Sequence, residues 1–262
     1  MSDLLANRIA LVTGGARGIG LAVARGMLRE GARVVLADVD AATVEATGVE
    51  LEREAPGRVL AVTADVTDEA STEALADAAE RAFGTVDVAV ANAGILLLRH
   101  AVDTDVAAWR KVIDVNLTGA FITAKVFAKR MLAAGVPGRI IFTSSLFGVR
   151  GGVENSAYSA TKWALLGITE CMAAELGGSG ITVNSVCPGQ VDTEMMRQLA
   201  ADRSALRGTT PEEEIGRLTA KVPMGRLADP AEIADVYVFL ASHLARYVNG
   251  RSIVVDGGWL VG

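Results

Sequence analysis

Tyr158 and Lys162 are the two residues of this sequence whose types and spacing most clearly permit chemistry. They stand four positions apart in an apolar, alanine-rich stretch, so a helix there would place both side chains on one face. A fixed positive charge within a few ångströms of a phenol favours the phenolate. We therefore expect Lys162 to lower the pKa of Tyr158 towards neutral pH and to make the phenol an acid–base catalyst. Because the same spacing is common on solvated helix faces, this interpretation depends on the rest of the sequence.

The composition indicates a single domain over residues 1–262. Of the 262 residues, 51% are hydrophobic and 21% are charged, which is enough for one sizeable core, and no linker or repeat divides the chain. A formal net charge of -6 argues against a nucleic-acid partner, since binding to phosphates normally requires clustered Lys and Arg. The sequence has no secretion signal and no charge-free segment long enough to cross a membrane. We therefore expect a soluble, cytoplasmic protein whose partners are small molecules.

The cysteines and histidines predict no metal site. Cys171 and Cys187 lie in apolar surroundings without the spacing of metal ligands. His100 and His243 have no carboxylate or cysteine at ligand spacing. The two cysteines suit a reducing cytoplasm better than an oxidising compartment.

Short apolar runs alternate with longer stretches of helical periodicity along the whole chain, a pattern typical of a parallel α/β sheet. Most of the short runs are apolar throughout, as strands covered on both faces are. We expect strands at 8–13, 33–37, 59–64, 86–91, 139–143, 181–187 and 252–255. The expected helices are 19–30, 41–54, 69–83, 106–134, 157–176 and 231–240. The fold predicted from this order is a doubly wound parallel sheet of about seven strands with helices on both faces.

A glycine-rich turn follows the first expected strand, in the run Thr13-Gly14-Gly15-Ala16-Arg17-Gly18-Ile19-Gly20. Gly14 permits a tight turn, Gly18 lets the backbone approach a ligand, and Gly20 lets the next helix pack closely on the sheet. The free N–H groups and the helix dipole would then face an anion. The turn therefore predicts a phosphate-binding site.

Asp38 predicts which dinucleotide binds there. It ends the second expected strand, twenty residues after Gly18, where a carboxylate can accept hydrogen bonds from the adenosine ribose hydroxyls and would repel a 2′-phosphate. We therefore expect NAD(H) rather than NADP(H). Arg17 could instead meet a 2′-phosphate, although its simpler interpretation is a solvent-exposed cation of the loop.

Several further motifs stand in a recognisable order. Ser144-Ser145 ends the fifth expected strand, and Ser145 lies thirteen residues before Tyr158. The remaining matches are Gly14-xxx-Gly18-x-Gly20, Asp65-Val66, Asn92-Ala93-Gly94, Asn116 in Asn116-Leu117-Thr118-Gly119, and Pro188-Gly189 followed by Thr193. With these motifs the chain resembles, over nearly its whole length, a single-domain short-chain dehydrogenase/reductase of about 250 residues with a Rossmann-type fold.

The resemblance implies a hydride-transfer enzyme. Ser145 would hydrogen-bond the substrate oxygen, Tyr158 would exchange its proton, Lys162 would hold the nicotinamide ribose, and Asn116 would complete a proton relay through a water. Read from the residues alone, Asn116 could also be a locally bonded helix residue and Ser145 a strand-end cap. The expected cofactor contacts are Gly14, Arg17, Gly18, Ile19, Gly20, Asp38, Asp65, Val66, Asn92, Ala93, Gly94, Tyr158, Lys162, Pro188, Gly189, Val191 and Thr193.

The segment 190–222 follows a strand end and predicts a lid over cofactor and substrate. The candidate pocket residues are Leu146, Val153, Gln190, Met195 and Met196, with Arg150, Glu154 and Asn155 as possible polar contacts. They favour a small, uncharged secondary alcohol or ketone of the diol, polyol or hydroxyketone type. A 3-oxoacyl-thioester reductase and a non-catalytic dinucleotide-binding regulator are the alternatives. By analogy with such relatives we expect a homotetramer, with Trp259 as a candidate contact between subunits.

Overall fold

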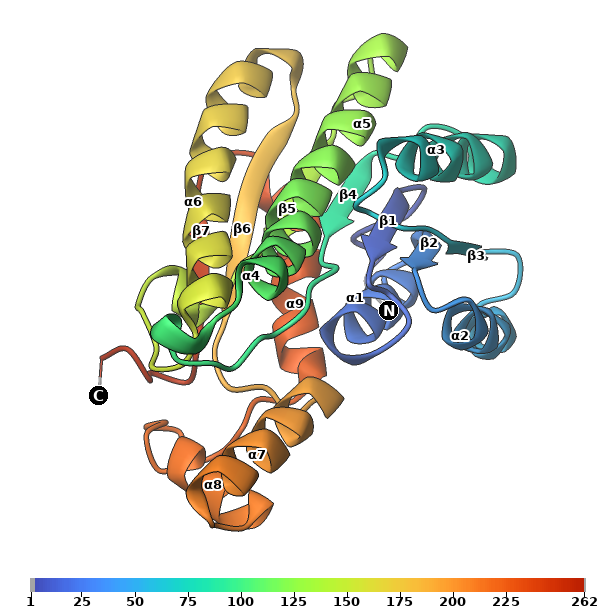
Figure 1. Ribbon diagram of the computed structural model, residues 1–262. Helices are drawn as coiled ribbons and strands as arrows, with labels where there is room; N and C mark the ends of the chain where they lie inside the picture. Colours follow the sequence, from blue (N-terminus) through green and yellow to red (C-terminus); the bar gives the residue numbers. More distant parts are fainter. Residues whose placement is uncertain (1–2, 262) are drawn as a thin grey trace.

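A seven-stranded parallel sheet forms the centre of the molecule (Figure 1). The computed structural model describes residues 3–261. The strands are β1 (Ile9–Thr13), β2 (Arg33–Asp38), β3 (Val59–Thr63), β4 (Val88–Ala91), β5 (Arg139–Thr143), β6 (Thr182–Pro188) and β7 (Ser252–Val255). Their order in the sheet is β3-β2-β1-β4-β5-β6-β7, with every neighbouring pair parallel. All seven expected strands are confirmed.

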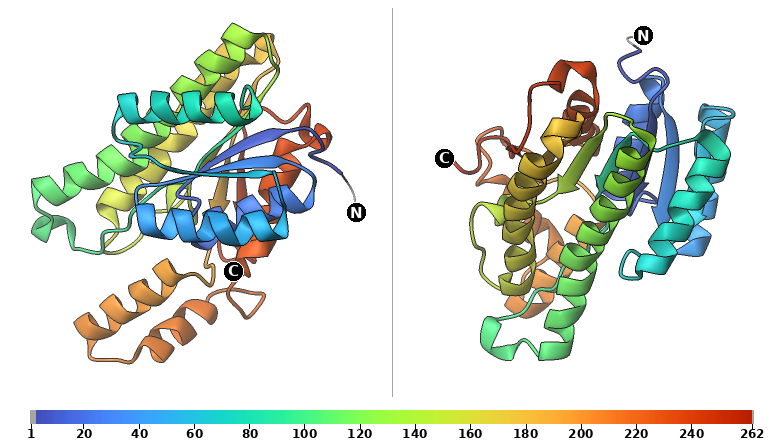
Figure 2. Two further views of the ribbon diagram at one scale, coloured as in Figure 1. Left: turned by 90° about the vertical axis from the view of Figure 1, so that its right-hand side faces the viewer. Right: turned by 90° about the horizontal axis from the view of Figure 1, so that it is seen from above.

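Helices cover both faces of this sheet (Figure 2). The α-helices are α1 (Gly18–Arg29), α2 (Ala41–Glu54), α3 (Glu69–Phe83), α4 (Val106–Ile113), α5 (Gly119–Ala134), α6 (Ser156–Leu176), α7 (Glu194–Arg207), α8 (Pro211–Thr219) and α9 (Pro230–Ala241). One buried cluster joins the strands to α1, α2 and α9, and a second joins them to α3, α5 and α6. Within residues 3–261, no helix combines the length and the hydrophobicity that a membrane crossing requires.

The pleat of the strands explains why both faces need a cover. In β1, Ala10 and Val12 point into the cluster with α1 and α9, whereas Ile9 and Leu11 point into the cluster with α3 and α5. Each fully buried aliphatic side chain of this kind contributes about 1.5–3 kcal/mol relative to an exposed one. An all-apolar strand is therefore stable only between two layers of helices, as the sequence pattern predicted.

The strand order reverses between β1 and β4. The chain moves outward from β1 to β3 on one side and from β4 to β7 on the other, so the crossovers leave the sheet in opposite directions at this point. In doubly wound sheets a crevice opens there, outside the carboxyl ends of the strands. Both the glycine-rich turn after β1 and Asn92 after β4 lie at this edge.

The single helix expected over 106–134 is wrong. A π-helical turn at Asp114–Thr118 separates α4 from α5, so the chain inserts one wider turn instead of continuing as a regular α-helix. Single π-turns inside α-helices are frequent at functional sites, where they change the direction in which one residue points. That residue here is Asn116, the only residue of the turn that is buried.

The lid segment also contains more structure than expected. It holds the two helices α7 and α8, and the acidic run Glu212-Glu213-Glu214 after Pro211, which favours the start of a short helix, lies in the first turn of α8. A capping box at Thr210 and Glu213 begins α8, as each side chain accepts from the other residue's backbone N–H. In Figures 1 and 2 the two helices lie together beyond the carboxyl end of the sheet, where a lid would be placed.

The beginning of α9 matches its sequence signals. Asp229 is the N-cap and accepts from Ala231 N at 2.8 Å, Pro230 is the first helical residue, and Glu232 accepts from Asp229 N at 2.8 Å. These bonds fix the first turn of α9, which packs against α1.

Gly20 is the glycine of α1 with the least space around it. A Cβ atom there would lie 2.1 Å from Gly14 O, so the backbone would have to shift. We expect Gly20→Ala to lower the free energy of unfolding by about 1–3 kcal/mol through overpacking. Gly26→Ala is the matched control in the same helix, because its Cβ would only touch Val238 and Ala234 at 3.4 and 3.6 Å. Urea denaturation of both variants tests the prediction, and equal stabilities would contradict it.

Candidate active site

Tyr158 and Lys162 lie on one face of α6, as their spacing predicted. Lys162 is buried, with 3% of its surface exposed, and its Nζ donates to Thr143 O at 2.7 Å. The same Nζ lies 5.4 Å from the centroid of the Tyr158 ring. The end of β5 therefore holds the ammonium beside the phenol.

The expectation that Lys162 lowers the pKa of Tyr158 is wrong for this structure. Burial raises the pKa of Tyr158 above its usual range, and a hydrogen bond from Ser145 opposes this rise without cancelling it. Burial also lowers the pKa of Lys162 to about 8. Both shifts have the same cause, since removing water disfavours the charged form of each group, and neither a phenolate nor an ammonium is well solvated here.

The two serines after β5 have different partners. Ser144 Oγ donates to Lys162 O at 2.8 Å and so ties the strand end to the backbone of α6. Ser145 Oγ accepts from Phe147 N at 3.2 Å and hydrogen-bonds Tyr158. Of the two, Ser145 thus stands beside the candidate acid–base group, as the thirteen-residue interval predicted.

The π-helical turn brings Asn116 to the same region. Asn116 is fully buried, and its side chain accepts from Ile95 N at 2.7 Å and donates to Ile95 O at 2.8 Å and Thr161 Oγ1 at 3.4 Å. A Cβ on Gly94 would lie 3.3 Å from Asn116 Oδ1 and 3.6 Å from Lys162 Nζ. Gly94 therefore leaves room between the asparagine and the lysine.

The glycine-rich turn fits the phosphate-binding role predicted for it. Gly14 and Gly18 have φ values of +60° and +56°, which a side chain would strain. A Cβ on Gly18 would meet only the Thr193 side chain, at 3.7 Å, so the backbone is open to a ligand. No side chain caps the N-terminus of α1, whose first turn has no acidic residue, and its N–H groups remain available to an anion.

Asn92 links this turn to the rest of the crevice. Its Nδ2 donates to Thr13 O at 3.0 Å and Gly14 O at 3.2 Å, and its Oδ1 accepts from Thr143 Oγ1 at 3.1 Å. Thr13 Oγ1 in return accepts from Asn92 N and Ala93 N, at 3.0 and 3.2 Å. One side chain thus braces β1, β4 and β5 where the strand order reverses.

Asp38 and Arg17 lie at the glycine turn, Arg17 within it and Asp38 hydrogen-bonded to it. Asp38 Oδ2 accepts from Ala16 N at 3.4 Å and Oδ1 from Asp40 N at 3.1 Å, which holds the carboxylate beside the turn. Arg17 is exposed and pairs with Asp40 at 2.9 Å and Glu194 at 3.7 Å. Its charge is thus partly neutralised by two carboxylates.

The remaining expected cofactor contacts divide into two groups. Asp65 is exposed and accepts from Thr67 N at 2.9 Å, while Val66 is buried against Gly119. The other group follows β6, where Gly189 packs against Asp256 and Thr193 caps α7 by accepting from Met196 N at 3.2 Å. The structure also locates Ile19 in the first turn of α1, Pro188 at the end of β6, and Val191 in a bridge with Ala228.

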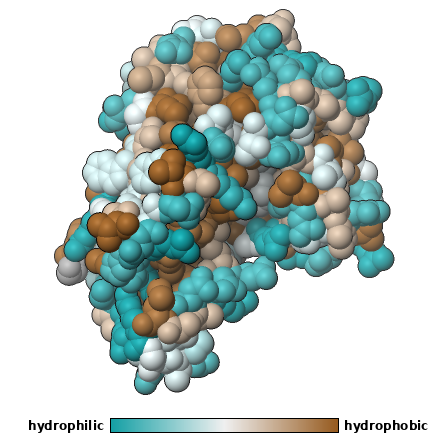
Figure 3. All heavy atoms as spheres, viewed as in Figure 1, coloured by the Kyte–Doolittle hydropathy of each residue, from teal (hydrophilic) through white to brown (hydrophobic). Residues whose placement is uncertain are grey.

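An open groove of about 530 Å³ runs between α1, residues 192–197 and the first residues of α9, and it borders the glycine turn. Arg17 and Gly18 line it from the turn, and Thr193 and Glu194 line it from the first residues of the lid. Figure 3 shows the surface hollowed between the lid and the main body, with hydrophobic residues among the hydrophilic ones. Ser145, Tyr158 and Lys162 are not among its lining residues, so this groove borders the glycine turn without containing the candidate catalytic residues.

The candidate pocket residues do not all face inward. Leu146, Gln190 and Met196 are buried, whereas Val153 is 71% exposed and Met195 is 45% exposed. The inner side of the lid is apolar because Met196, Leu199 and Leu218 pack with Leu96, Leu98 and Leu227. Arg150 stacks over the Trp259 ring at 5.1 Å, so the tryptophan contacts the loop after Ser145.

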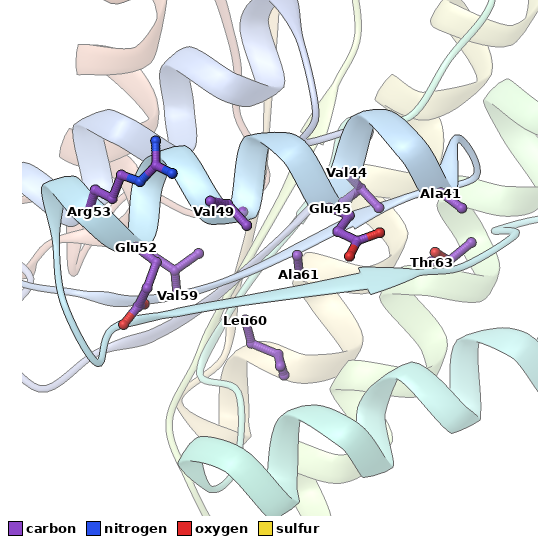
Figure 4. Close-up of a pocket in the computed structure, with 11 residues that line it drawn as sticks. Ala41, Val44, Glu45, Val49, Glu52, Arg53, Val59, Leu60, Ala61 and Thr63 are labelled. Atoms are coloured by element: carbon purple, nitrogen blue, oxygen red, sulfur yellow. The ribbon is translucent and has the colours of Figure 1, made fainter.

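A second groove lies away from these residues. It has a volume of about 610 Å³ and runs between α2 and β3 at the edge of the sheet (Figure 4). Its lining includes Val44, Val49, Val59 and Ala61, with Glu45, Glu52 and Arg53 at its rim, and it contains none of the motif residues. Size therefore does not identify the active site, whereas the convergence of polar groups does.

Sequence reasoning missed Thr143 and Tyr237. Thr143 carries the carbonyl that holds Lys162, and its hydroxyl lies 2.7 Å from Tyr237 OH. Neither residue belongs to a motif. The one feature of the sequence that could have indicated Tyr237 is its hydroxyl group within the otherwise apolar run Val236 to Leu240.

Known proteins similar to this chain agree with the geometry. A family model described as Enoyl-(Acyl carrier protein) reductase matches residues 14–260. The cis-4-hydroxycyclohexanecarboxylate dehydrogenase of Sinomonas cyclohexanicum is 42% identical over 261 residues, covering 99% of both chains. The L-rhamnose 1-dehydrogenase (NAD(P)(+)) of Azotobacter vinelandii is 40% identical and covers 98% of both.

A solved structure described as a short-chain type dehydrogenase/reductase from Mycobacterium marinum has a TM-score of 0.89 at 33% identity, covering 99% of both chains. The chain therefore belongs to the short-chain dehydrogenase/reductase family and is an oxidoreductase acting on CH–OH groups.

Proposed function

We propose that the chain is an NAD-dependent dehydrogenase of small secondary alcohols or ketones of the diol, polyol or hydroxyketone type. The observation that carries the proposal is the meeting of Ser145, Tyr158 and Lys162 beside the glycine turn, at the carboxyl edge of the sheet. When bound, the dinucleotide supplies the hydride donor or acceptor. The chain itself supplies orientation and the proton.

Each of the three residues has a role that its contacts support. Ser145 can donate to a carbonyl oxygen or accept from an alcohol, and its hydroxyl lies near enough to Tyr158 to affect that residue's pKa, so both groups would serve one substrate oxygen. Tyr158 gives or takes the proton. The Lys162 ammonium has three N–H groups, and only one of them is used in the hydrogen bond to Thr143 O. The others can donate to the nicotinamide ribose hydroxyls. Asn116, beside Gly94 and Lys162, would continue the proton path through a water.

Two features of the lid segment support a largely uncharged substrate. The inner side of the lid is aliphatic, and the buried Gln190 lies where the chain leaves β6. The names of two relatives describe a hydroxylated cyclohexane and a sugar as their substrates. A 3-oxoacyl-thioester reductase is the alternative, since it would use the same Ser145, Tyr158 and Lys162.

The preference for NAD rests on the adenosine side of the turn. Asp38 places a negative charge where a 2′-phosphate would bind, and Arg17 is engaged by Asp40 and Glu194. Arg17 could offset the repulsion between Asp38 and a 2′-phosphate only by leaving its ion pairs with Asp40 and Glu194.

The assembly that we propose is a homo-oligomer, with a homotetramer as the expected form, located in the cytoplasm. Phe121 and Leu132 of α5 and Trp163 of α6 are 44%, 46% and 50% exposed, and these large apolar side chains are the candidates for contacts between subunits. Cys171 and Cys187 are both free, which suits a reducing compartment. Light scattering of the purified protein gives the number of subunits.

A substrate panel tests the proposed function. Steady-state rates would be measured with NAD and with NADP on cyclic diols, hydroxycyclohexanecarboxylates, aldoses, open polyols and 3-hydroxyacyl thioesters. We expect the highest kcat/KM with NAD and a small cyclic or polyhydroxy alcohol. Turnover confined to the thioesters with NADP, or to a bulky steroid, would contradict the proposal.

Tyr158→Phe removes only the hydroxyl that exchanges the proton. We expect kcat to fall at least about 100-fold, because general acid–base catalysis contributes factors of this size. The affinity for NADH, measured by fluorescence, should stay within about twofold, because the ring is retained and the ribose is held by Lys162. Unchanged turnover would exclude the assigned role.

Asp38→Asn keeps the shape of the side chain and removes its charge. We expect the ratio of kcat/KM for NAD to that for NADP to fall by about tenfold or more, as a repulsion near the protein surface is removed. The two ratios are measured with the same substrate and compared with the wild type. A ratio that does not change would locate cofactor choice elsewhere.

The rates of alcohol oxidation and of carbonyl reduction should depend on pH in opposite ways. Oxidation of an alcohol needs the deprotonated phenol, and burial raises the pKa of Tyr158, so kcat/KM for oxidation should rise as the pH becomes alkaline. Reduction needs the protonated phenol and should be favoured at neutral pH. Rates of both reactions over a pH series check this, and parallel profiles would contradict it.

A further inference from the structure

Tyr237 is a fully buried tyrosine that none of the motifs includes. It lies on the inner side of α9, among Ile233, Ala234, Val238 and Leu240, and its hydroxyl approaches Thr143 Oγ1 at 2.7 Å. Burial raises the pKa of Tyr237 far above its usual range, so the phenol stays protonated. A protonated, buried hydroxyl needs an acceptor, and Thr143 is the one that it has.

The direction of this hydrogen bond follows from the neighbouring Asn92. The Asn92 amide faces two carbonyl oxygens, Thr13 O and Gly14 O, which only an N–H group can satisfy. Its Oδ1 therefore faces Thr143 and accepts the single proton of that hydroxyl. Only lone pairs remain on Thr143 Oγ1, so Tyr237 must donate. The two hydrogen bonds therefore have the same direction: Tyr237 donates to Thr143, and Thr143 donates to Asn92.

Thr143 is the branch point of this chain of bonds. Its hydroxyl leads through Asn92 to Gly14 in the glycine turn, and its carbonyl accepts from Lys162 Nζ at 2.7 Å. Thr143 is thus connected by hydrogen bonds both to the turn that would hold the pyrophosphate and to the lysine that would hold the nicotinamide ribose. Tyr237, on α9, is hydrogen-bonded to the hydroxyl of Thr143.

We propose that the Tyr237 hydroxyl is a positioning group for catalysis, which holds Thr143 so that the glycine turn and Lys162 are aligned together on one dinucleotide. The proposal rests on the functions assigned above to Lys162 and to the glycine turn. It goes beyond them by placing part of the control of the site in α9. The competing view is that Tyr237 only fills space in the core, which a phenylalanine would do equally well.

Tyr237→Phe separates these views, because it retains the ring and removes only the donor. Without that donor, the lone pairs of Thr143 Oγ1 are left unsatisfied in a dry interior, and the threonine or Asn92 reorients. We expect the affinity for NADH, measured by fluorescence without substrate, to fall about threefold to tenfold. We expect kcat to fall by a similar factor with whichever alcohol the substrate panel identifies.

Thr143→Val tests the same hydrogen bond from its other end. It keeps the branched shape, removes the hydroxyl and should cost at least as much in NADH affinity, since Asn92 also loses its donor. The double variant should be no worse than Thr143→Val alone, because both changes break one chain of bonds. If Tyr237→Phe did not fold, the loss in Thr143→Val would still decide the matter, because unchanged NADH affinity there would overturn the proposal.

Two control variants exclude a general loss of stability. Val238→Ala lies next to Tyr237 in the same helix and opens a cavity in the same core, so it should lower the melting temperature and leave NADH affinity and kcat unchanged. Tyr247→Phe removes a hydroxyl from a fully exposed tyrosine and should change nothing. Wild-type NADH affinity and kcat in Tyr237→Phe, or equal losses in Val238→Ala, would overturn the proposal.

NADH binding and turnover are read separately, so failure of the proposed function remains distinguishable. A lowered NADH affinity in Tyr237→Phe would support the link to the glycine turn even if no alcohol were oxidised. Normal affinity combined with normal turnover would reject the positioning role while leaving the dehydrogenase activity in place.

Discussion

The burial of one ammonium group is the constraint on which the site depends. Lys162 has lost nearly all contact with water, and the carbonyl of Thr143 replaces part of the lost solvation. That carbonyl is available only because β5 ends there and Ser144 anchors the strand end to α6 through Lys162 O. The catalytic helix and the central strand are consequently fixed to each other at the charged residue itself. Burying the ammonium still costs free energy, because one carbonyl does not replace all of the lost water. The lowered pKa of Lys162 is consistent with this cost.

The crevice works as one unit because its two halves share hydrogen-bonded residues. Asn92 contacts the first turn of the cofactor site and the end of β5, across the point where the sheet reverses its order. Thr193, the N-cap of the first helix of the lid segment, lies opposite Gly18, so the glycine turn also borders this segment. Hydrogen bonds through Asn92 and Thr143 therefore connect the glycine turn to Lys162.

Sequence reasoning succeeded where a residue acts through local geometry. The seven strands, the turn around Gly18, and the shared face of Tyr158 and Lys162 all follow from periodicity, glycine and helical spacing. It failed where a property depends on distant partners. The raised pKa of Tyr158 results from burial by several elements, and the bond between Tyr237 and Thr143 joins residues 94 positions apart. No local pattern encodes either of these, so they required the folded structure.

The π-helical turn at Asp114–Thr118 has a consequence for how this region tolerates change. Each residue of an α-helix turns the chain by about 100°, so deleting one residue from this turn would rewind the two flanking helices into a continuous spiral. The downstream half would then rotate by that angle relative to the upstream half. Asn116 could then keep its hydrogen bond to Ile95, or Phe127 of α5 could stay in the core. A regular helix would not allow both. The extra residue in the π-helical turn lets Asn116 point towards Ile95 while the apolar face of α5 remains packed in the core.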